Sequence, residues 1–129
     1  MQTSIAPLLS VRKGAEAINF YKTAFGARVL YRVDAEDGAV IARLSVGGAE
    51  FWLADESPEH FNFSPETLGG STVRVVMIVD DPDAVVDRAR AAGAKVVRPV
   101  SNEHGWILGR IADPFGHQWE IGKEVKKAD

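Results

Sequence analysis

The chain contains the stretch Ala17-Ile18-Asn19-Phe20-Tyr21-Lys22-Thr23-Ala24-Phe25-Gly26-Ala27-Arg28-Val29-Leu30, whose pattern returns in the second half as Ala84-Val85-Val86-Asp87-Arg88-Ala89-Arg90-Ala91-Ala92-Gly93-Ala94-Lys95-Val96-Val97. Alanine, glycine, a basic residue and valine recur at matching places in the two copies. Each copy predicts a helix that stops at glycine, because glycine readily adopts the positive φ found just past a helix end. A strand follows each glycine.

The sequence around these two stretches also repeats. Leu8-Leu9-Ser10-Val11 corresponds to Val76-Met77-Ile78-Val79, and Ile41-Ala42-Arg43-Leu44 resembles Leu108-Gly109-Arg110-Ile111. Each half therefore predicts the order strand, helix, strand, strand, strand. The expected strands are 5–11, 27–34, 38–46 and 49–55 in the first half and 72–79, 95–99, 105–112 and 117–122 in the second.

Length and composition favour a single domain covering residues 1–129, with a first module at about 3–55, a loop at 56–70 and a second module at about 71–123. The net charge is -3, and no basic run precedes the short tail at 123–127, which argues against nucleic-acid binding. The chain has no cysteine, so thiolate metal sites are excluded. Without a signal-peptide pattern or a long apolar run, we expect a cytoplasmic protein with no membrane partner.

Two tandem modules of this order resemble the vicinal oxygen chelate superfamily of glyoxalases, bleomycin-resistance proteins and dioxygenases. Ala17-Ile18-Asn19-Phe20-Tyr21-Lys22-Thr23-Ala24-Phe25-Gly26-Ala27 is similar to its helix-and-glycine pattern, and Asp113-Pro114-Phe115-Gly116-His117-Gln118-Trp119-Glu120-Ile121 to its turn and last strand. The resemblance implies an α+β fold in which two βαβββ modules curl a mixed sheet around a central cavity. It also implies a homodimer.

The resemblance implies where a metal would bind, since metal-dependent members carry a His or Glu ligand on the first and last strand of each module. By the internal alignment these positions are Ala6, Trp52, Arg74 and Glu120. Of the four, only Glu120 has a side chain that can serve as a metal ligand. We therefore expect no metal and no other cofactor.

Arg74 and Glu120 occupy neighbouring ligand positions in this alignment, and two interpretations stay open. They form an ion pair that only neutralises the carboxylate, or Arg74 offers its guanidinium to a carboxylate, carbonyl or phosphate of a ligand.

Further candidates for ligand binding are residues that strand alternation turns toward the cavity or that lie on flanking loops. Trp52 and Trp106 are either aromatic walls or packing residues, and Phe61 and Phe63 either form a lid or pack. His104 is either an exposed loop residue or overhangs the cavity, whereas Trp119 is expected to face the helices. The complete set of candidates is Leu8, Trp52, Phe61, Phe63, Arg74, His104, Trp106, Leu108, Arg110 and Glu120.

The function favoured by these residues is metal-independent binding of a small molecule, as in members of the resembled family that sequester bleomycin-type or other aromatic antibiotics. A first alternative is an isomerase, lyase or dioxygenase that uses Glu120 as its base, or a metal bound at an unforeseen site. A second is a dimeric module that serves only protein association.

Overall fold

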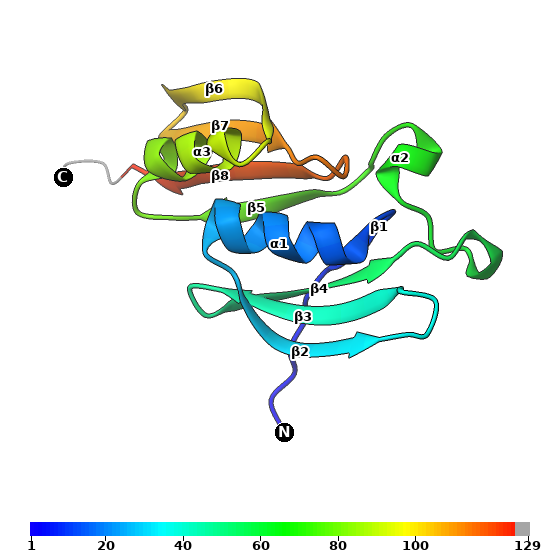
Figure 1. Ribbon diagram of the computed structural model, residues 1–129. Helices are drawn as coiled ribbons and strands as arrows, with labels where there is room; N and C mark the ends of the chain where they lie inside the picture. The colour runs from blue at the N-terminus through cyan, green and yellow to red at the C-terminus, as the bar shows by residue number, and fades with distance from the viewer. Residues whose placement is uncertain (126–129) are drawn as a thin grey trace.

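The computed structural model describes residues 1–125, so the end of the predicted basic tail, at 126–127, lies outside the described residues. The chain forms two four-stranded sheets with strand orders β1-β4-β3-β2 and β5-β8-β7-β6 (Figure 1). The elements are β1 (Leu8–Val11), α1 (Gly14–Phe25), β2 (Arg28–Asp34), β3 (Val40–Val46), β4 (Ala49–Asp55), a 3-10 turn (Pro58–His60), α2 (Pro65–Leu68), β5 (Arg74–Ile78), α3 (Pro82–Ala91), β6 (Lys95–Glu103), β7 (Trp106–Ala112) and β8 (Gln118–Glu124).

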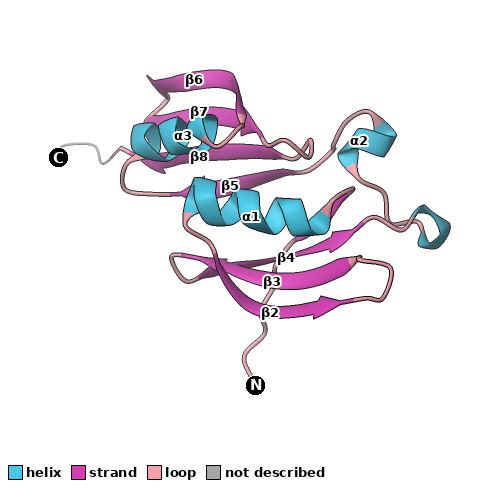
Figure 2. Ribbon diagram, in the orientation of Figure 1, coloured by secondary structure: helices cyan, strands magenta, loops and turns pink. Residues whose placement is uncertain are grey.

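The repeated βαβββ order and the α+β class predicted from the sequence are confirmed (Figure 2). In each sheet the first strand pairs in parallel with the last, and the other pairs are antiparallel. Helix α1 ends at Gly26, which has a φ of 68° and donates its N–H to the Lys22 carbonyl. This is the positive φ for which the repeated glycine was expected.

Two strand boundaries differ from the prediction for reasons that involve proline. Strand β1 begins at Leu8 rather than at residue 5, directly after Pro7, which has no N–H to donate to a sheet. Strand β6 continues through Pro99 to Glu103 instead of ending at 99. Because β6 is an edge strand with register shifts around Arg98, a residue without an N–H does not break a ladder between two neighbours.

The predicted loop at 56–70 contains the 3-10 turn and α2. Ser64 caps α2 by accepting a hydrogen bond from the Thr67 N–H, and Pro65 follows at the first helical position. Glu56 accepts hydrogen bonds from the Ser64 N–H and the Thr67 hydroxyl. These bonds, led by that from Ser64, lower the pKa of Glu56.

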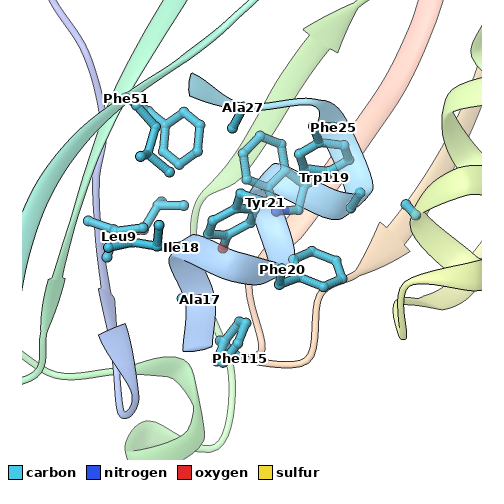
Figure 3. Packing of buried hydrophobic residues seen from close by; sticks show 14 of the residues in the cluster. Leu9, Ala17, Ile18, Phe20, Tyr21, Phe25, Ala27, Phe51, Phe115 and Trp119 are labelled. Atoms are coloured by element: carbon cyan, nitrogen blue, oxygen red, sulfur yellow. The ribbon is translucent and has the colours of Figure 1, made fainter. Parts of the chain in front are cut away.

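One aromatic core joins the two modules. Trp119 of β8 is 2% exposed and packs against Tyr21 and Phe25 of α1 and Phe51 of β4, with ring centroids 4.9–5.6 Å apart (Figure 3). Trp119 therefore faces the helices, as strand alternation predicts. Within residues 1–125, α1 packs on the first sheet and α3 on the second, and the opposite face of each sheet, called the open face below, is not covered by these helices.

The buried carboxyl group of Asp113 connects residues of this core through hydrogen bonds. Asp113, 5% exposed, accepts hydrogen bonds from the Tyr21 hydroxyl at 2.5 Å and from Trp119 Nε1 at 2.9 Å. Its other oxygen accepts from the backbone N–H groups of Phe115 and His117. The Asp-Pro-Phe-Gly stretch is therefore more than a turn, because its first residue connects the second module to α1.

Tyr21 makes the stability of the fold depend on pH in the alkaline range. Burial, then the charge and hydrogen bond of Asp113, raises the pKa of Tyr21 well above its usual 10.0. An unfolded tyrosine loses its proton above about pH 10, whereas folded Tyr21 keeps it, so the folded state binds more protons there. This contribution is fully present below pH 10. Above it, the free energy of unfolding should fall by up to about 1.4 kcal/mol per pH unit.

Urea denaturation on both sides of pH 10 measures this slope. Because other groups also titrate there, the parent is compared with Tyr21→Phe, which should lose the component of the slope due to Tyr21. Tyr31→Phe is the matched control, since Tyr31 is 48% exposed. Equal slopes for the parent and Tyr21→Phe would contradict the assignment.

Candidate functional site on the open faces

Corresponding rows of side chains cross the open faces of the two sheets. In the first sheet the register places Leu8, Trp52, Arg43 and Tyr31 opposite one another on β1, β4, β3 and β2. In the second, Val76, Glu120, Arg110 and Arg98 are related in the same way on β5, β8, β7 and β6. Side chains paired across strands share a face of the sheet. Trp52 thus corresponds to Glu120, and Arg43 to Arg110.

The row on the second sheet brings the predicted polar residues together. Arg110 Nε donates a hydrogen bond to Glu120 Oε1 at 2.8 Å, and Arg74 Nε lies 3.6 Å from the same oxygen. The Glu120 side chain is 13% exposed and that of Arg74 is 54% exposed. The predicted proximity of Arg74 and Glu120 is confirmed. The shorter contact, however, comes from Arg110, which the sequence analysis had not paired with Glu120.

A cavity of about 490 Å³ opens beside this pair and is called the open-face cavity. It gathers four of the candidate residues, and its lining comprises Thr72, Arg74, Val76, Trp106, Leu108 and Glu120. Most of this surface is apolar, and the charged groups lie at one place within it. Apolar surface with a few polar groups is the usual lining of a small-molecule site.

The open face of the first sheet is aromatic. Trp52 contacts Tyr31 edge-on, with ring centroids 6.0 Å apart, and the Arg43 guanidinium lies 5.4 Å from the Trp52 ring centroid. Arg43 Nε is buried without a hydrogen-bond partner among residues 1–125, since Glu50 approaches only to 3.5 Å. Trp52 lines neither of the two cavities described in this section.

A second cavity, of about 720 Å³, lies between β1 and the linker and is called the linker cavity. Leu8, Phe63 and His117 line it. The buried His117 is hydrogen-bonded through Nε2 to the Ser10 carbonyl at 2.8 Å, so it joins the two modules. The sequence showed His117 as a turn residue, and nothing in its local pattern indicated burial, because the contact comes from the other module.

Phe61 and His104 lie outside both cavities. Phe61 is 83% exposed and contacts Phe63 edge-on, with 6.5 Å between ring centroids. His104 occupies the turn between β6 and β7 with a φ of 53°. Their predicted roles in ligand binding therefore have no support from a cavity lining, whereas Phe63 keeps such support.

Comparison with known proteins places the chain in a family. A sequence model of the Glyoxalase/Bleomycin resistance protein/Dioxygenase superfamily matches residues 4–121. The chain belongs to this superfamily. An uncharacterized protein of Mycobacterium tuberculosis is 37% identical over 134 residues, which cover 100% of this chain and 79% of that protein.

Two solved structures share the fold of this chain. A protein from Arabidopsis thaliana has a TM-score of 0.75 and 30% identity, with 95% of this chain and 100% of that chain covered. FosX, a fosfomycin resistance protein from Listeria monocytogenes, has a TM-score of 0.74 and 11% identity, covering 97% of this chain and 95% of its own. At that identity the likeness to FosX shows the shared fold.

The positions at which the resemblance implies metal ligands are Trp52, Arg74 and Glu120, besides Ala6 before β1. In the part of the chain that the structure describes, no three His, Asp or Glu side chains gather as a metal site. The donor set is one carboxylate beside two guanidinium groups, which does not fit a divalent cation. Among residues 1–125 no helix has the length and apolar character required to cross a membrane.

Proposed function

We propose that this protein binds small, flat aromatic molecules without a metal, aromatic antibiotics among them, and does so as a homodimer. The proposal rests on the residues at the positions on the open faces where metal ligands would be expected. An indole and a guanidinium stand at two of these positions, and the remaining carboxylate is already engaged by Arg110. Stacking and hydrogen bonding to a ligand replace chelation.

Exposed apolar side chains on the open faces support the proposal that a second copy of the chain covers these faces. Val76 is 62% exposed and Ile78 58%, and Leu8, Tyr31 and Trp106 are also exposed on the same faces. Contiguous apolar surface of this kind marks an interaction site. Because the modules repeat the same strand order, the first module of one copy can cover the second module of another. In a two-fold symmetric dimer this contact between a first and a second module occurs twice.

Such a dimer places the aromatic row of one copy opposite the charged row of the other. A single chain separates these rows on two sheets, and Trp52 lines neither described cavity. The proposed binding site is therefore completed by the second copy, with Trp52 as an aromatic wall and Arg74 as a polar contact.

Tryptophan fluorescence during titration with a panel of flat aromatic acids, amides and polycyclic antibiotics tests the proposal. We expect saturable binding that EDTA leaves unchanged, no stoichiometric metal in the purified protein, and no consumption of the ligand. Trp52→Ala should weaken binding about tenfold, because aromatic stacking contributes about 1.4 kcal/mol.

Leu68→Ala is the matched control for this titration, since Leu68 lines the linker cavity and not the open-face cavity. It should leave the affinity unchanged. A loss of affinity in Leu68→Ala but not in Trp52→Ala would move the ligand to the linker cavity. Stoichiometric metal, or binding abolished by EDTA, would overturn metal independence and favour the enzymes of the superfamily.

A further inference from the structure

The charged row on the second sheet carries more positive than negative charge. Arg98 and Arg110 lie opposite each other, Arg110 lies opposite Glu120, and Arg74 approaches Glu120 from β5. Two guanidinium groups, those of Arg74 and Arg110, thus lie against one carboxylate, and Arg98 adds a third positive charge on the strand beyond Arg110, so these four side chains carry an excess of two positive charges. An ion pair that served only to neutralise an inherited carboxylate would need one cation.

Other acidic side chains on this face lie far from the row. Glu103 and Glu124 are both paired with Trp106, which precedes Arg110 by four residues on β7. Four residues of a strand span about 13 Å, which exceeds the screening length at physiological salt. The excess charge around Arg110 is therefore not cancelled locally.

The guanidinium nitrogens of these arginines indicate that the ligand carries an acid group. The hydrogen bond from Arg110 to Glu120 uses Nε, and within residues 1–125 the terminal nitrogens of Arg110 make no hydrogen bond. Glu120, which lines the open-face cavity, therefore orients the guanidinium of Arg110, whose side chain is 23% exposed and adjoins that cavity without lining it. Guanidinium nitrogens bind the paired oxygens of carboxylates and phosphates especially well.

The corresponding row on the first sheet can bind the aromatic part of a ligand whose acid group lies on the second sheet. Trp52 and Tyr31 supply aromatic surface, and Arg43 between them carries a buried Nε with no hydrogen-bond partner in the described chain. An aromatic ring can stack there while a negative group lies on the second sheet. The two rows together match a flat ring that bears an acid.

We infer that the ligand is a planar aromatic anion, whose carboxylate or phosphate-type group binds Arg110 and Arg74 and whose ring lies against Trp52. This inference rests on the proposed function and specifies the ligand class of the same site. In this site Glu120 orients the arginine side chains. Its negative charge also repels the anion to some extent.

Two matched compounds test the charge alone: 2-naphthoate and its neutral amide, 2-naphthamide, titrated against the dimeric protein by tryptophan fluorescence. We expect naphthoate to bind about tenfold more tightly than the amide and to weaken as salt is raised. Arg110→Gln should remove most of this preference. Glu120→Gln should instead strengthen naphthoate binding about fivefold, because the amide oxygen still accepts the hydrogen bond from Arg110 Nε and keeps the guanidinium oriented, while the repulsive charge near the acid group is removed.

Arg32→Gln is the control, since Arg32 is paired with Asp34 at 2.9 Å and lies opposite the fully buried Ala42, away from the open face. It should change neither affinity. Circular dichroism of each variant establishes that it is folded before titration.

The outcomes separate this inference from the proposed function. If the two compounds bind equally well, or if the amide binds more tightly, the inference that the ligand is an anion is wrong. If binding in that case still depends on Trp52, the proposed binding of aromatic molecules is unaffected. Weaker naphthoate binding in Glu120→Gln would also overturn the inference that the ligand is an anion. If no aromatic compound of either charge binds in a manner that depends on Trp52, the proposed function fails, and the inference fails with it.

Discussion

Asp113→Ala should lower the free energy of unfolding by about 4 kcal/mol, which is a large part of the stability of a domain of this size. The side chain accepts from two buried side chains and two backbone N–H groups. Alanine leaves these four donors without their acceptor in a buried part of the core, and the loss of charge-assisted hydrogen bonds adds to that penalty. Urea denaturation at neutral pH measures the difference.

Asp87→Ala is the control for this variant, because Asp87 is exposed and, among residues 1–125, its charged partner is Arg90, at 3.7 Å on the same helix. It should change the free energy of unfolding by less than about 0.5 kcal/mol. An Asp113→Ala protein as stable as Asp87→Ala would show that the hydrogen bonds around Asp113 do not hold the two modules together.

Ile78→Asp should separate the proposed dimer while leaving the single chain folded. The side chain is 58% exposed on the open face of β5, so one chain alone tolerates a carboxylate there. Under a second copy the carboxylate of each chain would be buried without a partner, at about 3 kcal/mol for each of the two symmetric contacts, which weakens dimerisation roughly ten-thousandfold. Sedimentation equilibrium over a range of protein concentrations measures this constant.

Leu68→Asp introduces the same charge at a residue that is 65% exposed on the linker helix α2, off both open faces. It should dimerise like the parent, and both variants should have the parent's circular dichroism. A monomeric parent, or a dimer unaffected by Ile78→Asp, would contradict the covering of the open faces by a second copy. Aromatic binding should weaken together with dimerisation, because the proposed site requires residues of both copies.

The local pattern of the chain was sufficient to predict the order of its helices and strands, whereas the arrangement of the two modules was inferred from the family that it resembles. The helix-and-glycine stretch ending at Gly26 has its counterpart at Gly93, and both follow helices as expected. Alternation along β8 correctly turned Trp119 toward the helices and Glu120 toward the open face. These features depend on side-chain periodicity and backbone conformation, which neighbouring residues largely determine.

Parts of the candidate site were predicted for the same reason. The internal repeat placed Arg74 beside Glu120, and alternation placed Trp106 and Leu108 on one face, where the open-face cavity now gathers them. The repeat does not specify which cation makes the closest contact with a carboxylate. That contact depends on side-chain conformations within the folded sheet, and it falls to Arg110.

Contacts between the modules were decided by the tertiary structure alone. Asp113 and Tyr21 are far apart in the chain, and neither carries a local sign that the other is its partner. The same holds for His117 and the Ser10 carbonyl. Periodicity assigns a residue to a face of its own element, whereas the groups that meet across elements depend on how α1 packs between the two sheets.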